Sequence, residues 1–280
     1  MRLIRVRKRQ VKTCVTAWRH SAALIVGLLL GFGDAEAKNP LKDSQVWPVA
    51  DHRLTVKAPV GSGALALYLS RDWDGPQPAV TRAIVTIHGI ERAADIARTI
   101  AEVGRAASKL DPESVLLIEP QFLDDTDVAA YHLPAETLHW AHTGWEGGED
   151  AHGPAPISSF AALDAILARL ADRATFPALK TVVIVGHSGD GQLVQRYAVA
   201  GRSEGALTKA GIHLRYVVAN PSSYVYFSSE RPAGDGFALF DDAACPAFDR
   251  WKYGMTGLPN YLAGDDPAAL EAAYAARDVV

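Results

Sequence analysis

This chain of 280 residues has few cysteines and no long hydrophobic run. Its two cysteines are Cys14 and Cys245, and Cys14 lies in a segment that we expect to be removed. A single remaining cysteine excludes an intrachain disulfide. We interpret Cys245 as a buried, inert thiol, with a reactive or intermolecular thiol as the minority alternative.

The hydrophobic run nearest the N-terminus, at 21–32, is too short for a comfortable membrane span. Small residues, Ala35-Glu36-Ala37, follow it as a cleavage site. Seven basic residues precede it, namely Arg2, Arg5, Arg7, Lys8, Arg9, Lys12 and Arg19. This pattern predicts a signal peptide at 1–37 and a secreted or periplasmic protein with no stable membrane anchor after cleavage. An uncleaved amphipathic anchor is the alternative.

Positive charge is also scarce once the signal peptide is set aside. The whole chain has 28 basic and 32 acidic residues, for a net charge of −4. Without the seven basic and two acidic residues of 1–37, 21 basic and 30 acidic residues remain, for a net charge of −9. An acidic domain is a poor partner for nucleic acid or an anionic membrane. The length of 38–280 suits one α/β domain.

Strand-like and helix-like patterns alternate along this domain. Helical spacing of apolar residues covers 92–110, 158–172 and 192–200. Short apolar runs predict strands at 83–87, 115–118, 182–185 and 214–219, and another strand begins at Arg277. Such alternation predicts a mainly parallel sheet flanked by helices.

The most informative stretch is Thr-Val-Val-Ile-Val-Gly-His-Ser-Gly-Asp-Gly at 181–191. A strand that runs through a sharp turn into a helix lifts a serine hydroxyl clear of the sheet, so Ser188 is the candidate nucleophile. A negative tetrahedral intermediate needs preplaced N–H donors. We expect one from Gly189 and a second from the loop after the strand that ends in His88, from Ile90 or Gly89.

These residues resemble the α/β-hydrolase superfamily, in particular secreted serine esterases with a G-H-S-A-G-G-Q nucleophile elbow. The resemblance rests on Gly186-His187-Ser188 and on the segments 87–89, 119–123, 157–160, 192–197, 220–224 and 251–254. It implies an α/β-hydrolase-type sheet and hydrolysis of a small-molecule or polymeric ester through Ser188. No cofactor is implied.

Two departures from the family pattern predict impaired activity. Asp190 stands where G-x-S-x-G has glycine, and we expect it to harm the elbow or the charge of the transition state. The family order is Ser, acid, then His, yet only His213 follows Ser188, at the start of a strand and so at the end opposite the active site. The resemblance therefore implies a domain cut short at its C-terminus. A catalytically inactive homologue or a ligand-binding protein is the alternative function.

The segment 120–156 is rich in Gly, His, Trp and Pro and reads as a lid or cleft loop. A metal site there lacks a strong ligand motif, so we expect none. We expect six residues to line the substrate cleft, namely His88, Gly89, His187, Trp140, Trp145 and Tyr224.

Overall fold

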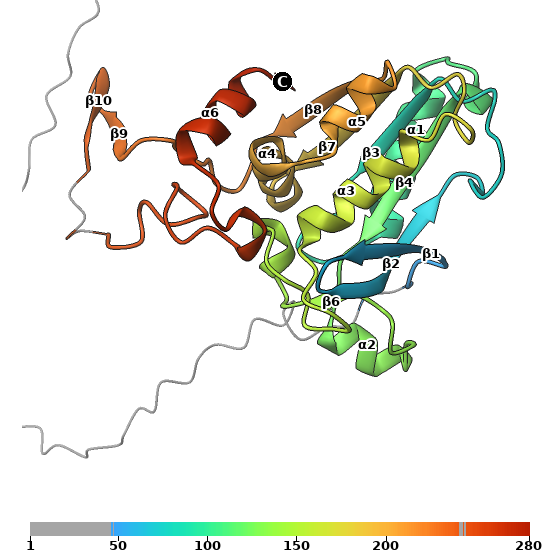
Figure 1. Cartoon of the computed structure of the whole chain (residues 1–280), viewed down its shortest axis with the longest axis horizontal. Coiled ribbons are helices and arrows are strands. Elements are labelled where there is room, and N and C mark those ends of the chain that lie inside the picture. Colours follow the sequence, from blue (N-terminus) through green and yellow to red (C-terminus); the bar gives the residue numbers. More distant parts are fainter. Residues whose placement is uncertain (1–45, 47, 241–242, 244) are drawn as a thin grey trace, which may run out of the picture. The chain divides into compact units, whose positions relative to one another are not determined.

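The protein is described from a computed structural model, in which residues 46, 48–240, 243 and 245–280 are placed (Figure 1). Its centre is a seven-stranded sheet with the order β1-β2-β4-β3-β7-β8-β11. β1 and β2 are antiparallel to their neighbours, whereas β4, β3, β7, β8 and β11 run parallel. The strands are β1 His52–Ala58, β2 Gly61–Leu69, β3 Arg82–Thr86, β4 Val115–Gln121, β7 Thr181–His187, β8 His213–Ala219 and β11 Asp278–Val279.

Helices cover both faces of this sheet. Phe160 of α3 and Leu193 of α4 pack in the main core, while Ala94 of α1 packs against Tyr68 on the other face. The helices are α1 Ala94–Ala107, α2 Asp125–Tyr131, α3 Ser159–Leu170, α4 Gly189–Ala200, α5 Glu204–Lys209 and α6 Pro267–Ala275. The predicted mainly parallel sheet flanked by helices is confirmed, as is the strand after Arg277, which pairs with β8.

The helix α1, predicted from its helical spacing, buries few of its apolar residues. Only Ala94 and Ala97 of α1 are buried. Three larger apolar side chains with the same helical spacing, Ile96, Ile100 and Val103, are 54–65% exposed. The larger apolar side chains of this helix therefore lie on the surface of the protein and are not packed in its core.

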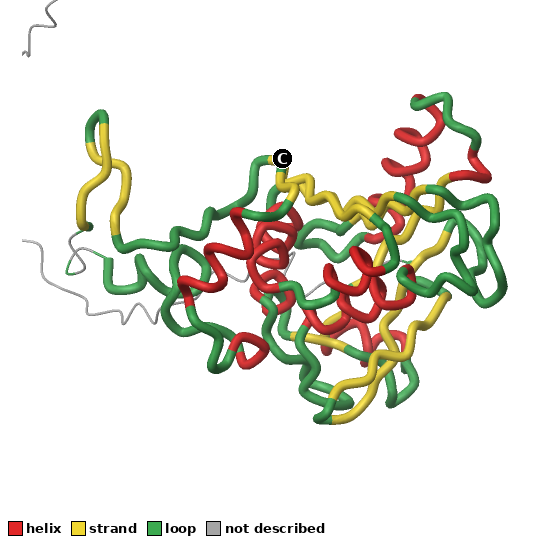
Figure 2. Tube along the Cα trace, turned by 45° about the horizontal axis from the view of Figure 1, so that its top comes forward, coloured by secondary structure: helices red, strands yellow, loops and turns green. Residues whose placement is uncertain are grey.

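The segment 120–156 is more regular and more buried than a loop. It contains α2, the short strands β5 Leu123–Asp124 and β6 His139–Trp140, and a 3₁₀ turn at Gly144–Gly147. β5 and β6 pair in parallel. The stretch between β8 and α6 is mostly loop, as its composition predicts. Its described residues form the hairpin of β9 Glu230–Ala233 and β10 Gly236–Leu239 and a 3₁₀ turn at Asn260–Leu262 (Figure 2).

Two expectations about single segments have different outcomes. Cys245 is exposed, so its interpretation as a buried thiol is wrong. The predicted signal peptide at 1–37 lies outside the described residues. Among the residues that are described, no helix is long and apolar enough to cross a membrane.

Candidate active site

Ser188 stands on a strained turn between β7 and α4. Its backbone has φ 64° and ψ −120°, a region that a residue with a Cβ seldom adopts. The N–H of Ser188 donates to the carbonyl of Ala219 at 3.1 Å, and its carbonyl accepts from Ser222 at 2.9 Å and Gln192 at 3.0 Å. The turn is therefore held from both β8 and α4, and the side chain of Ser188 is left exposed.

Glycine is required on both sides of this turn. A Cβ on Gly186 would lie 2.4 Å from the carbonyl oxygen of Asp190, and one on Gly191 would lie 2.8 Å from that of Ala219. Any side chain at either position would force β7, α4 and β8 apart. The predicted strand–turn–helix around Ser188 thus has the close packing that a nucleophile elbow needs.

Asp190 fits the backbone of this turn, so the first of our two expectations, that it would harm the turn itself, is wrong. Its Oδ2 accepts a hydrogen bond from the N–H of His187 at 2.9 Å, and the residue is only 9% exposed. Burial raises the pKa of this carboxyl group, although the bonded His187 N–H opposes the shift. The turn is accommodated, but a carboxyl group now stands beside the place where a negative intermediate would form.

The second predicted oxyanion donor lies close to the first. The backbone nitrogen of Ile90 is 4.0 Å from the position that a Cβ on Gly189 would occupy. The turn that carries Ile90 is closed by the N–H of Arg92, which donates to the carbonyl of Gly89 at 2.9 Å. The loop after β3 and the first turn of α4 therefore meet beside Ser188.

His88 fixes this loop and is not free to act as a base. Its Nε2 accepts from the N–H of Phe122 at 2.9 Å, which leaves Nδ1 to donate to the carbonyl of Gly89 at 2.8 Å. The ring packs edge-on against Phe122 and Trp145, with centroids 5.6 and 4.8 Å away. Burial lowers the pKa of His88 to about 4, so the ring stays neutral at ordinary pH.

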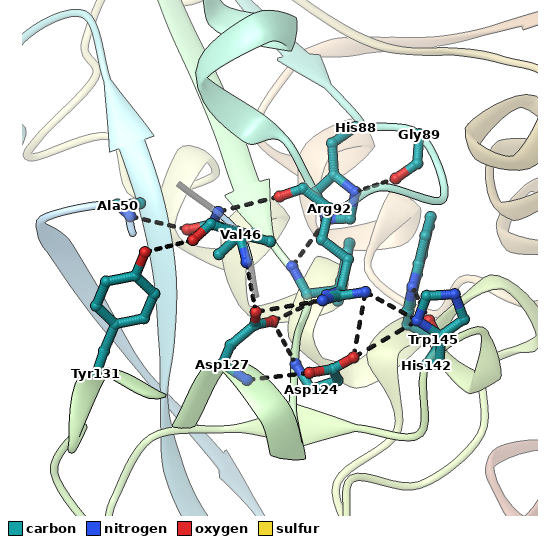
Figure 3. A network of polar contacts seen from close by, with 12 residues as sticks. Val46, Ala50, His88, Gly89, Arg92, Asp124, Asp127, Tyr131, His142 and Trp145 are labelled. Carbon is teal, nitrogen blue, oxygen red and sulfur yellow. Dashed lines mark hydrogen bonds and ion pairs between the residues drawn. The ribbon is translucent and has the colours of Figure 1, made fainter. Parts of the chain in front are cut away.

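A buried ion cluster that the sequence analysis missed anchors the same loop (Figure 3). Arg92 has φ 58° and is 1% exposed. Its Nε lies 2.8 Å from Oδ2 of Asp127, and its Nη1 lies 3.1 Å from Oδ2 of Asp124 and 2.8 Å from Nδ1 of His142. Asp124 and Asp127 also cap α2 reciprocally, a D-x-x-D pattern that could have pointed to the helix start.

Ser188 opens into a cavity of about 620 Å³. Six of the predicted site residues line it, namely Ser188, Gly189, Ile90, His88, Gly89 and His187. Trp140 and Trp145 do not, because both are fully buried in the main core, so their assignment to the cleft wall is wrong. Tyr224 is 55% exposed and lies outside the cavity lining, which corrects its assignment as well.

Glu146 lines this cavity and comes from the segment 120–156, which we expected to form a lid or cleft loop. It is 8% exposed, and its Oε1 is 2.8 Å from the position that a Cβ on Gly189 would take. Its Oε2 accepts from Nε2 of Gln192 at 3.1 Å. Burial raises the pKa of Glu146, opposed by the charges of Lys252 and Arg196. Two buried carboxyl groups, Glu146 and Asp190, therefore flank the donors beside Ser188.

No group in the described part of the chain forms a hydrogen bond with the hydroxyl of Ser188. His213 pairs with Thr181 at the start of β8, whereas His187 pairs with Ala219 at its end. Six residues of strand span roughly 20 Å, so His213 lies at the far end of the sheet, where it bonds Asp278. Within the described ranges, no three His, Cys, Asp or Glu residues form a cluster that could hold a metal ion.

The strand order, the flanking helices and the strained strand–turn–helix at Ser188 are those of an α/β-hydrolase-type fold. No family model matches the chain, and no curated protein matches it significantly. Among solved structures, it is similar to poly(aspartic acid) hydrolase-1 from Sphingomonas sp. KT-1, at 19% identity and a TM-score of 0.47, over 82% of this chain and 69% of that chain.

Two further solved structures are less similar. A poly(3-hydroxybutyrate) depolymerase from Bordetella parapertussis matches at 19% identity and a TM-score of 0.39, over 62% of this chain and 52% of that chain. The chain thus spans about half the length of that protein. An α/β serine hydrolase without a lid from Xanthomonas campestris matches at 14% identity and a TM-score of 0.28, over 82% and 94%. At this level of similarity, the assignment of the fold rests on the sheet and the elbow.

Proposed function

We propose that this chain is a serine hydrolase that cleaves carboxylic esters through Ser188. The observation that carries the proposal is the strained elbow that presents Ser188 to a cavity of about 620 Å³ beside the N–H groups of Gly189 and Ile90. Oγ of Ser188 would attack the ester carbonyl, and the two N–H groups would stabilise the oxyanion. The alcohol leaves, and water then releases the acid and restores the serine.

A ligand-binding protein or an inactive homologue is the second candidate. One observation favours it: in the described residues, nothing is bonded to the Ser188 hydroxyl that could remove its proton. Without a base, only binding and oxyanion stabilisation remain, which in serine proteases retain roughly 10³–10⁴-fold acceleration over water.

The proposal predicts slow but measurable hydrolysis of p-nitrophenyl butyrate. The rate should exceed that of buffer by more than the roughly 10³-fold that binding and oxyanion donors supply without a nucleophile, and it should fall to that residual level in Ser188→Ala. Release of p-nitrophenol, followed by absorbance, measures both rates. Ser158→Ala is the matched control, since Ser158 caps α3 away from the cavity. Equal rates for the unsubstituted protein and Ser188→Ala would favour the ligand-binding alternative.

We further propose export to the periplasm or the medium, with small-molecule or polymeric esters as substrates and no nucleic-acid or membrane partner. The basic segment, apolar run and Ala35-Glu36-Ala37 support export. The net charge of −9 in 38–280 supports the absence of polyanionic partners.

A further inference from the structure

The cavity beside Ser188 has an acidic floor. Glu146 and Asp190 are each more than nine-tenths buried, and each holds one carboxylate oxygen in a hydrogen bond to the protein. Oε1 of Glu146 has no hydrogen-bond partner among the described residues, whereas the carboxyl group of Asp190 also receives a hydrogen bond from its own backbone N–H. Oε1 of Glu146 lies against Gly189, and Oδ1 of Asp190 is 3.9 Å from the position of a Cβ on Gly89. Both oxygens therefore stand at the expected oxyanion donors.

The charges around this floor are mixed. Lys252 at the rim and the buried Arg196 act on Glu146, and Glu91 adds a negative charge at the rim. Lys252 forms no ion pair within 4.0 Å in the part of the chain that the structure describes. His187 also lines the cavity and is exposed to solvent. Two carboxylates next to a developing oxyanion oppose it, unless the substrate supplies a positive charge.

Part of the cavity lining is apolar. Ile90, Ile96 and Ile100 line it, at 42%, 54% and 64% exposure. These side chains continue from the oxyanion loop along α1. A ligand that fills the cavity therefore meets both carboxylate oxygens and aliphatic surface.

We propose that this cavity selects esters whose acyl part bears an ammonium group next to the scissile carbonyl and an aliphatic side chain, as in α-amino esters, with Glu146 and Asp190 binding the ammonium group. The ammonium group donates to Oε1 of Glu146 and to the carboxylate of Asp190, while the aliphatic side chain packs on Ile90 and Ile96. The proposal rests on the function proposed above, because Ser188 marks where the carbonyl lies.

A binding measurement on Ser188→Ala separates this proposal from the hydrolase activity. Leucine ethyl ester and ethyl 4-methylpentanoate differ only by the amino group, and NMR titration at pH 6.5 gives both dissociation constants. We expect the amino ester to bind roughly ten- to a hundredfold more tightly, as for hydrogen bonds to charged groups. Equal affinities would overturn the proposal.

Two double variants test the assigned residues. Adding Glu146→Gln or Asp190→Asn to Ser188→Ala should remove most of the preference for the amino ester. Glu271→Gln, on the exposed face of α6, should leave it unchanged. A preference that survives both substitutions would overturn the assignment. If either double variant fails to fold, the Ser188→Ala protein alone suffices, because protonation of the carboxylates should abolish the preference as the pH falls.

The outcomes for binding and hydrolysis are distinguishable. Preference for the amino ester in Ser188→Ala, without esterase activity in the unsubstituted chain, contradicts only the proposed hydrolase. Esterase activity with equal binding of the two esters contradicts only the ammonium selectivity.

Discussion

Arg92→Met should lower the free energy of unfolding by about 3–5 kcal/mol, because it leaves buried carboxylates without their cation. Asp127 is fully buried, and Asp124 is 4% exposed. The substitution keeps an unbranched, flexible side chain but removes its ion pairs with both residues. Urea unfolding at neutral pH measures the change.

Arg215→Met is the matched control for this experiment. Arg215 also pairs with an aspartate, Asp278, but its side chain is 49% exposed. An exposed pair contributes about 1 kcal/mol or less. Similar losses of unfolding free energy in the two variants would show that the buried ion pairs of Arg92 stabilise the protein no more than an exposed pair does.

Glu119→Gln should make the protein more stable at alkaline pH by at least about 2 kcal/mol. Glu119 on β4 is fully buried, and neither carboxyl oxygen has a hydrogen-bond partner among the described residues. Burial raises the pKa of Glu119 from 4.5 to about 8. This difference in pKa between the unfolded and folded states corresponds to a cost of roughly 5 kcal/mol for ionising Glu119 in the folded protein. Relaxation of the folded protein around the charge reduces this cost.

The sign of this effect follows from proton binding. Between pH 4.5 and about 8, the folded protein holds a proton on Glu119 that the unfolded chain has lost. Stability from this group is therefore present below pH 4.5 and is lost as the pH rises towards 8. His88, with its pKa lowered from 6.5 to about 4, acts in the opposite direction below pH 6.5.

The difference between Glu119→Gln and the unsubstituted protein isolates Glu119 from His88. This difference should be small at pH 5 and should grow steadily to pH 8.5 in urea unfolding. Glu113→Gln, at an exposed glutamate, should show no such growth. Parallel stability curves for Glu119→Gln and the unsubstituted protein would rule out a protonated Glu119.

Local sequence patterns predicted the two backbone segments that build the site, the turn at Ser188 and the loop after β3. The β-branched run of β7 and the glycines around Ser188 fix strand, turn and helix within eleven residues, and Ala83–Ile87 placed the oxyanion loop in the same way. Both predictions depend on short-range geometry, which sequence encodes directly.

Contacts between distant segments were not predictable in this way. Trp140 and Trp145 stand in a stretch with many glycines and prolines and no helical or strand period, so nothing in the sequence marked them as core. Glu146 reaches Gly189 across more than forty residues of chain. Only the packing of the 3₁₀ turn against α4 brings that carboxylate to the elbow.

Labelling with a neutral fluorophosphonate, followed by peptide mapping, tests the central role of Ser188 most directly. The account predicts one label per chain, confined to Ser188 and absent from Ser188→Ala. The reaction should be slower than that of a serine with a histidine partner, because no described residue takes its proton. A folded protein whose Ser188 remains unlabelled, or is labelled no faster than other serines, would contradict the account.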